Sequence, residues 1–303
     1  MACAGGAPVL NRVRDGRTIN YIGRAAAGAA VEQFTVRNGI GRGGPKLIPY
    51  IGCKSGFMHI FDQLVPDDPG RIYDIFGGGG SFAFYACGRF GAKKVVYNDH
   101  NPVVANLVRT LQRDPGGLHA EYQKHYSKSS PEYYLGVRDK DLLDGTRGAG
   151  RFFYLAKNAF SGKIRFNTKN KFNSPMRKGA RCPRVDADAL RSLASSISGM
   201  EITCRDFAEY DDISGSFVYL DPPYMNNPNG HYNAVVGLDE FSRFVQKIEG
   251  RNRVMISEQN DPDSLRLSPG YTIFKVSLRR SLQYFTQNGS SEIIAVNYDA
   301  GHG

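Results

Sequence analysis

Short apolar runs alternate with amphipathic stretches along this 303-residue sequence from about residue 44 onward. Residues 71–76 and 94–98 are predicted strands. A stretch with helical periodicity follows each of them, at 81–90 and at 101–111. Because neighbouring parallel strands need a crossover connection, this alternation is typical of a parallel sheet covered by helices. The sequence therefore predicts an α/β fold.

The C-terminal third of the chain continues the same pattern. Residues 216–220 and 253–257 are predicted strands, with a predicted helix at 238–250 between them. The runs at 271–276 and 292–298 are expected to pair as a terminal antiparallel unit. One sheet is thus expected to draw its strands from two separate parts of the chain.

Residues 112–199 break the alternation, so we expect an inserted, mostly helical domain there. Residues 44–111 and 200–303 would then form the domain that contains the sheet. Residues 1–43 are rich in Ala, Gly and Arg and poor in acidic residues, which predicts a flexible leader. An organelle-targeting segment is the alternative interpretation of this stretch.

Positive charge is concentrated in one part of the sequence. The chain has 39 Lys and Arg residues against 29 acidic residues, a net charge of +10. Residues 151–184 contain ten Lys or Arg residues and no acidic residue, so this stretch alone equals the net charge. Asn and Phe residues are interleaved with the basic ones, which suits contacts to nucleic acid. The alternative is a solvated basic loop whose Phe side chains anchor it to the core.

The cysteine pattern argues against a metal site. No two cysteines have C-x-x-C spacing, and no His spacing suggests a zinc site. We therefore expect reduced thiols at Cys3, Cys53, Cys87, Cys182 and Cys204. No apolar run approaches the ~18 residues of a membrane span. We therefore expect a protein of the cytoplasm, or of the nucleus in a eukaryotic host, that binds neither a membrane nor a metal.

A glycine-rich loop, FGGGGS, follows the first predicted strand of the sheet. Gly78, Gly80 and Ala83 fit the dinucleotide fingerprint, and Asp99 follows about 20 residues on, where a ribose-binding acid stands. This motif alone does not distinguish NAD from another adenosine-containing cofactor. A glycine-rich turn that binds no ligand is the other interpretation.

The tetrapeptide Asp221-Pro222-Pro223-Tyr224 ends a predicted buried strand. An exocyclic amine on an aromatic ring is a poor nucleophile, because its lone pair is delocalised into the ring. The Asp221 carboxylate and the Pro222 carbonyl, both acceptors, could take its two hydrogens and direct the lone pair at a methyl donor. Tyr224 offers a ring face to a base drawn out of a duplex. The alternative is a simple turn at the end of a strand.

These motifs resemble those of the Dam-type DNA adenine N6-methyltransferases, the D12 class or alpha group. The similarity runs from about Tyr50 to Tyr298 and follows the family's order. The matching segments are YIGCKSGFMHIFDQL (50–64), YDIFGGGGSF (73–82), YNDHN (97–101), NAFSGKIRFNTKNKFNSP (158–175), CRDF (204–207), YLDPPY (219–224) and VSLRRSLQYFTQNG (276–289). The resemblance implies a Rossmann-like methyltransferase sheet with an inserted DNA target-recognition domain at 112–199.

The resemblance also implies S-adenosyl-L-methionine as cofactor and assigns roles to individual residues. The implied cofactor-binding residues are Tyr50, Lys54, Asp74, Phe76, Gly78, Gly80, Asp99, Asp206, Phe207 and Asp221. The implied catalytic residues are Asp221, Pro222, Pro223 and Tyr224. No metal takes part in the implied reaction.

Double-stranded DNA is the partner that the resemblance implies. The implied DNA-binding residues are Asn158, Phe160, Lys163, Arg165, Asn167, Lys169, Lys171, Asn173 and Pro175. Among them Phe160 matches an aromatic wedge, Arg165 a guanine reader and Pro175 a base contact. Pro49 stands where members that methylate GATC carry a lysine that reads the first guanine, and Cys53 replaces a glycine of the opening motif.

We therefore expect an enzyme that flips an adenine out of the duplex and methylates its N6 within GATC or a related sequence. We expect it to act as a monomer, with a cognate restriction endonuclease as one possible partner in a restriction-modification system. Two alternatives stay open from the sequence. One is a catalytically silent DNA-binding protein on a methyltransferase scaffold, and the other is an N-methyltransferase that acts on RNA or on a protein glutamine.

Overall fold

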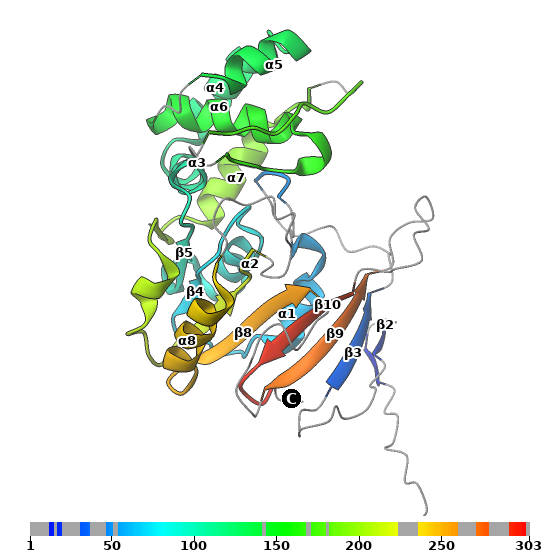
Figure 1. The fold of residues 1–303 in the computed structure, drawn as a ribbon. Coiled ribbons are helices and arrows are strands. Elements are labelled where there is room, and N and C mark those ends of the chain that lie inside the picture. Colours follow the sequence, from blue (N-terminus) through cyan, green and yellow to red (C-terminus); the bar gives the residue numbers. More distant parts are fainter. Residues whose placement is uncertain are drawn as a thin grey trace, which may run out of the picture.

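The computed structural model is centred on one eight-stranded sheet (Figure 1). The strand order is β3-β9-β10-β8-β7-β4-β5-β6. The strands are β3 (Val31–Val36), β4 (Ile72–Asp74), β5 (Val95–Asn98), β6 (Glu201–Thr203), β7 (Phe217–Leu220), β8 (Arg253–Gln259), β9 (Thr272–Leu278) and β10 (Ser291–Val296). The structure describes residues 12–14, 17–19, 31–36, 47–50, 54–140, 144–167, 171–179, 182–223, 236–259, 271–278 and 291–300.

Most neighbouring strands run parallel, and β10 is antiparallel to both β8 and β9. In the centre, Tyr73 of β4 pairs with Val96 of β5 on one side and with Val218 of β7 on the other. The predicted parallel sheet and its terminal antiparallel pair are therefore confirmed.

Helices cover both faces of the sheet because its central strands are apolar on both faces. Every residue of β5 and β7 is buried, as expected for strands enclosed by crossover helices. Alternate residues of β7 enter two different cores: Phe217 and Tyr219 pack with residues of α1 and α2, and Val218 and Leu220 pack with residues of α8. These helices are α1 (Met58–Leu64), α2 (Ser81–Phe90) and α8 (Leu238–Glu249).

The insertion between β5 and β6 is helical. After α3 (Pro102–Arg113) come α4 (Pro115–Tyr126), α5 (Pro131–Arg138), α6 (Gly145–Asn158) and α7 (Ala187–Ser196). Figure 1 shows α4, α5 and α6 at one end of the molecule and β3, β9 and β10 at the other. The helix α3 packs against α4, α6 and α7, and the buried residues of the insertion join the core formed by α1 and α2. The insertion and the sheet therefore share one hydrophobic core.

The expected leader contains three strands. β1 (Arg12–Arg14) and β2 (Arg17–Ile19) form an antiparallel pair, and β3 lies parallel to β9 at the edge of the main sheet. The sequence analysis did not predict these three strands within residues 1–43. The sequence of β3, VEQFTV, is rich in β-branched residues that favour a strand, and β9 offers an open edge whose backbone groups need partners.

Arg151, the first of the ten basic residues in 151–184, lies inside the protein. Its side chain is 4% exposed. Its guanidinium donates hydrogen bonds to the backbone carbonyls of Val137, Arg138 and Lys140. These carbonyls lie at and just beyond the end of α5, where a helix leaves its last carbonyls without partners. This positive charge therefore caps a helix and is not part of a DNA-binding surface.

Replacing Arg151 with methionine should destabilise the protein. The Arg151→Met variant keeps an apolar stem but leaves three carbonyls without their donor, which should lower the free energy of unfolding by about 2–3 kcal/mol. Urea-induced unfolding measures this loss. The control is Arg147→Met on the same helix, where the side chain is exposed, and where a change within about 0.5 kcal/mol is expected. Equal losses in the two variants would contradict the capping role.

Candidate functional site

The candidate site lies where the carboxyl ends of β4, β5 and β7 meet. From β4 the chain moves first to β5 and β6 on one side of the sheet, and later to β7 and β8 on the other. β4 therefore stands at the point where the strand order reverses, which is where open α/β sheets bind ligands. The glycine-rich loop follows β4, Asp99 follows β5, and Asp221 follows β7.

The glycine-rich loop is packed too closely for side chains. A Cβ on Gly77 would lie 2.2 Å from the Tyr97 ring, and one on Gly80 would lie 2.4 Å from the Phe84 ring. Gly78 and Gly80 also have φ angles of +48° and +82°, which favour glycine. The protein's own packing thus explains these glycines. The loop leads directly into α2, whose first backbone N–H groups face the loop as in known anion-binding turns.

Asp99 ties the second strand to this loop. Its Oδ2 accepts a hydrogen bond from the Gly78 backbone N–H at 2.9 Å, and its Oδ1 accepts one from the Asn101 N–H at 2.8 Å. Burial raises the pKa of Asp99 to about 6, although the two backbone donors act in the opposite direction. Each carboxylate oxygen has a second lone pair. Asp99 can therefore hold the loop and still accept from a ligand.

Asp74 is the most enclosed carboxyl group of the site, with an exposed fraction of 1%. Its Oδ2 accepts from the Ala83 backbone N–H at 3.1 Å. Its Oδ1 has no hydrogen-bond partner among the residues that the structure describes. Burial, and then the charges of Asp221 and Asp99, raise the pKa of Asp74 well above its usual range. A buried oxygen of this kind is what a polar ligand in the glycine-rich loop would satisfy.

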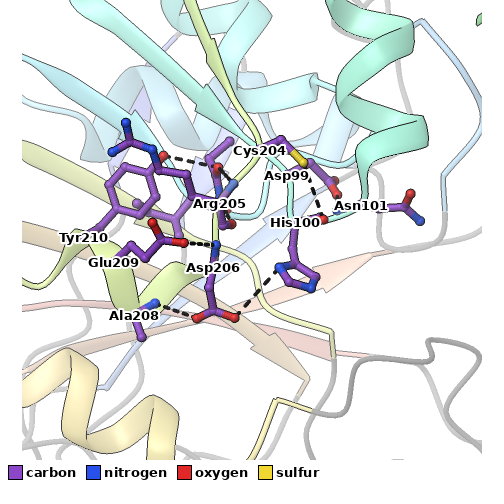
Figure 2. Close-up of polar contacts among 11 residues, drawn as sticks. Asp99, His100, Asn101, Cys204, Arg205, Asp206, Ala208, Glu209 and Tyr210 are labelled. Carbon is purple, nitrogen blue, oxygen red and sulfur yellow. Dashed lines mark hydrogen bonds and ion pairs between the residues drawn. The ribbon is translucent and has the colours of Figure 1, made fainter. Parts of the chain in front are cut away.

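Phe76, Asp206 and Phe207 come together beside the loop. The rings of Phe76 and Phe207 have centroids 5.6 Å apart. Asp206 caps the short helix η4 (Phe207–Tyr210) by accepting from the Ala208 N–H at 2.9 Å. Figure 2 shows the imidazole of His100 turned toward Asp206, with Nδ1 3.8 Å from Oδ2. An aromatic pair beside a carboxylate suits a flat ring that carries a donor group.

Asn98 is a site residue that the motif analysis did not single out. Its side-chain amide donates to the carbonyls of Ile75 and Arg205, and its Oδ1 accepts from the Arg205 N–H and the Thr203 hydroxyl. Asn98, the last residue of β5, therefore connects the end of this strand to the chain just beyond β4 and β6. Its position directly before Asp99 was the signal available in the sequence.

Lys54 belongs to the segment 50–64, the opening motif of the resemblance, and contacts Asp221, the first residue of the predicted catalytic loop 221–224. Its Nζ donates to Asp221 Oδ1 at 2.9 Å, across 167 residues of sequence. The Lys54 side chain is 3% exposed and that of Asp221 is 20% exposed. Pro222 is buried and Pro223 half-buried. Tyr224, the fourth residue of the predicted catalytic loop, lies outside the described residues.

The basic segment that follows α6 folds back on itself. The Phe160 N–H donates to the Pro175 carbonyl, and the Asn173 N–H donates to the Arg165 carbonyl. Bridges also join 159 to 176 and 166 to 172. We call residues 159–176 the recognition hairpin, of which 168–170, including Lys169, lie outside the described residues.

Three side chains of this segment point into the protein instead of toward DNA. Phe166 and Phe172 are buried and pack against Phe152, so the anchoring interpretation of these phenylalanines holds. Asn158 has no exposed surface, and its amide donates to the Tyr154 carbonyl of the preceding helical turn. In this conformation Asn158, for which the resemblance implied a DNA contact, ties the last turn of α6 together.

The other predicted DNA contacts lie nearer to the surface. Phe160 is 47% exposed, which is unusual for a large apolar side chain. Exposed or half-buried side chains are found at Lys163, Arg165, Asn167, Lys171, Asn173 and Pro175. Asn167 Oδ1 accepts from the Lys171 N–H at 2.9 Å and so shapes the hairpin.

The segment 47–50 lies between the glycine-rich loop and the recognition hairpin. A Cβ on Gly78 would lie 3.1 Å from the Tyr50 ring, and a Cβ on Gly162 would lie 2.8 Å from Pro49 Cβ. Two consecutive residues thus contact the two motifs to which cofactor and DNA were assigned. Within the described part of the chain, no group of three His, Cys, Asp or Glu side chains could hold a metal ion. No helix there is long and apolar enough to cross a membrane.

Two known methyltransferases are similar to this chain over most of its length. Type II methyltransferase M.MjaIII of Methanocaldococcus jannaschii is 27% identical over 285 residues, which cover 82% of this chain and 99% of its own. Type II methyltransferase M1.LlaDCHI of Lactococcus lactis subsp. cremoris is 26% identical over 272 residues, covering 82% and 94%. Among solved structures, the rRNA methyltransferase aviRa from Streptomyces viridochromogenes is 14% identical with a TM-score of 0.34, over 86% of this chain and 89% of its own. That likeness is too weak to carry an argument.

The family profile of the D12 class N6 adenine-specific DNA methyltransferases matches residues 50–252, more than half of the chain. This span begins at the opening motif and includes the glycine-rich loop, the recognition hairpin and the catalytic loop. The resemblance found in the sequence is therefore confirmed: the chain belongs to the D12 class and is an adenine-specific DNA methyltransferase.

Proposed function

We propose that this enzyme uses S-adenosyl-L-methionine to methylate N6 of a flipped adenine within a short specific sequence of double-stranded DNA. The observation that carries the proposal is the meeting of Asp221, Asp99 and the glycine-rich loop at the reversal point of the sheet. The recognition hairpin adjoins this point through Pro49. GATC or a related sequence is the proposed target.

The residues around the glycine-rich loop fit the proposed cofactor. The buried Asp74 Oδ1 is a polar atom that still needs a partner, and Asp99 can accept from the two ribose hydroxyls. Asp206 and the rings of Phe76 and Phe207 suit an adenine. When bound, the cofactor supplies an electrophilic methyl group.

The protein's part in the reaction is to orient the target amine. Asp221 and the Pro222 carbonyl follow β7 directly, on a loop that two prolines stiffen. The Pro222 carbonyl is an acceptor, and the Asp221 carboxylate, when ionised, is also an acceptor and not a donor. Together they can therefore accept both N–H hydrogens of the adenine amine. Tyr224 is proposed to stack on the flipped base.

The recognition hairpin is proposed to bind DNA through Phe160 as a wedge, Arg165 as a reader of guanine, and Lys163, Asn167, Lys169, Lys171, Asn173 and Pro175 as further contacts. Pro49 has no side-chain donor, and we therefore propose altered selection at the outer base. A monomer is the proposed state, and a restriction endonuclease is a proposed partner. The proposed location is the cytoplasm, or the nucleus of a eukaryotic host.

Removing the catalytic carboxylate should abolish most methyl transfer. The Asp221→Ala variant loses one of two preorganised acceptors, and we expect its rate of methyl transfer to fall at least ~10²-fold. Duplex binding should persist. The measurement is transfer of tritium from labelled cofactor to DNA, with the exposed Asp212→Ala as control. Retention of more than about a tenth of the rate would refute the role of Asp221.

Cofactor affinity should depend on the ionisation of Asp99. Because the pKa of Asp99 is raised to about 6, its ribose-accepting carboxylate is lost as the pH falls through that value. Above pH 7 we expect the dissociation constant of the cofactor to be independent of pH. Below pH 6 we expect it to increase with falling pH, with a slope that approaches about tenfold per pH unit. The Asp99→Asn variant should bind about 1–3 kcal/mol more weakly at neutral pH, with a flat profile.

Isothermal titration with S-adenosyl-L-methionine from pH 5 to 8 tests this dependence. The Asp206→Asn variant serves as control, because it should weaken binding without removing the pH dependence. A wild-type profile that stays flat down to pH 5 would rule out the proposed ribose contact.

Base recognition and phosphate binding should separate in two variants of the hairpin. If Arg165 reads a guanine, Arg165→Ala should cost ~1–3 kcal/mol on the best site and relax preference at one base position. If Lys171 contacts phosphate, Lys171→Ala should weaken all sequences alike and lower the salt slope by about 1. Methylation of a randomised duplex library measures both effects. An unchanged motif for Arg165→Ala would remove Arg165 from recognition.

A further inference from the structure

Lys54 and Asp221 form a partly buried ion pair at the site between residues far apart in the sequence. Lys54 belongs to the short helix η1 (Lys54–Gly56), and Asp221 follows β7. The two side chains meet at 2.9 Å, and Lys54 is 3% exposed. A lysine so deeply buried needs an anionic partner, because an isolated ammonium is costly to bury. Asp221 supplies that partner.

A second carboxyl group, that of Asp74, lies near Asp221. Asp74 at the end of β4 interacts with Asp221 closely enough for the Asp221 charge to raise the pKa of Asp74. Burial, and then the same charge, raise the pKa of Tyr219, whereas Lys54 lowers it. Lys54 thus offsets negative charge at the point where the catalytic carboxylate stands. Without it, Asp221 would face Asp74 in a poorly solvated site.

The contact also fixes the direction of the carboxylate. Lys54 engages Oδ1, and a carboxylate has enough lone pairs to accept from an ammonium and an amine together. An oriented carboxylate accepts a hydrogen bond from the target without first reorganising.

We infer that Lys54 is a positioning residue that holds the Asp221 carboxylate in the orientation that accepts from the adenine amine. This inference rests on the proposed function and deepens it. It differs from the cofactor contact that the opening motif implies for Lys54, since it assigns the ammonium to the catalytic loop. Lys54 acts on the rate of methyl transfer through Asp221.

The test separates the rate of methyl transfer from cofactor binding. Lys54→Met, which retains the apolar stem, should lower kcat at least ~10²-fold while the dissociation constant for S-adenosylhomocysteine changes less than about threefold. Lys54→Arg, which restores the charge, should recover at least about a tenth of the wild-type kcat. The matched control is Lys247→Met, because Lys247 also forms a 2.9 Å ion pair, with Asp211, but on the exposed surface. Its kcat should not change.

A double-mutant cycle keeps the test decisive if the single variant folds poorly. If Lys54 acts through Asp221, Lys54→Met should add less than about threefold to the loss already caused by Asp221→Asn. Multiplying losses would overturn the inference. So would weaker S-adenosylhomocysteine binding with unchanged kcat, which would make Lys54 a cofactor contact.

A third result would also overturn the inference. If Lys54→Met and Lys54→Arg lost kcat, cofactor binding and thermal stability equally, the role of Lys54 would be purely structural.

Failure of this inference is distinguishable from failure of the proposed function. If Asp221→Ala retains activity, the catalytic assignment itself fails. If Asp221→Ala is inactive but Lys54→Met has wild-type kcat, only the role of Lys54 fails.

Discussion

Buried hydrogen bonds at the carboxyl edge of the sheet hold the site together. Asn98 links the chain beyond three strands, Asp99 accepts from Gly78, and the Tyr97 hydroxyl donates to the Gly78 carbonyl at 2.8 Å. All three residues come from one short stretch at the end of β5. Because buried polar groups without partners are costly, these bonds strongly favour a single conformation of the glycine-rich loop. The loop is thereby ordered by the protein itself, which lowers the entropic cost of binding a ligand there.

The same edge concentrates negative charge, which the fold must accommodate. Asp221 and Asp99 lie close enough to Asp74 for their charges to raise its pKa. Asp99 is stabilised by backbone donors and Asp221 by Lys54, while Asp74 is held toward its neutral form by burial. Three chemically identical groups therefore differ because of their surroundings. Such divergence among neighbouring carboxyl groups is expected at functional sites and comes at some cost in stability.

Local patterns predicted six of the eight strands of the main sheet, but they did not predict which side of an element meets the core. The alternation at 71–76, 94–98 and 216–220 was enough to find the central parallel strands. The composition of 151–184 suggested a basic segment suited to nucleic acid, but it did not show that Arg151 and Asn158 are buried. Their partners lie on α5 and one turn back along α6. The strand at 31–36 was missed because its stability depends on pairing with β9, more than 200 residues away.

Long-range contacts of this kind also link the recognition hairpin to the glycine-rich loop. Pro49 lies against Gly162 of the recognition hairpin, and the next residue, Tyr50, lies against Gly78 of the glycine-rich loop. Pro49 and Tyr50 are consecutive, and the proline ring fixes φ at Pro49, so this segment has one soft backbone dihedral fewer with which to absorb a shift. A change at Pro49 that shifts the hairpin therefore also bears on Tyr50 and on the loop beneath it. Under the proposed function, a substitution at Pro49 would therefore affect both target selection and cofactor binding.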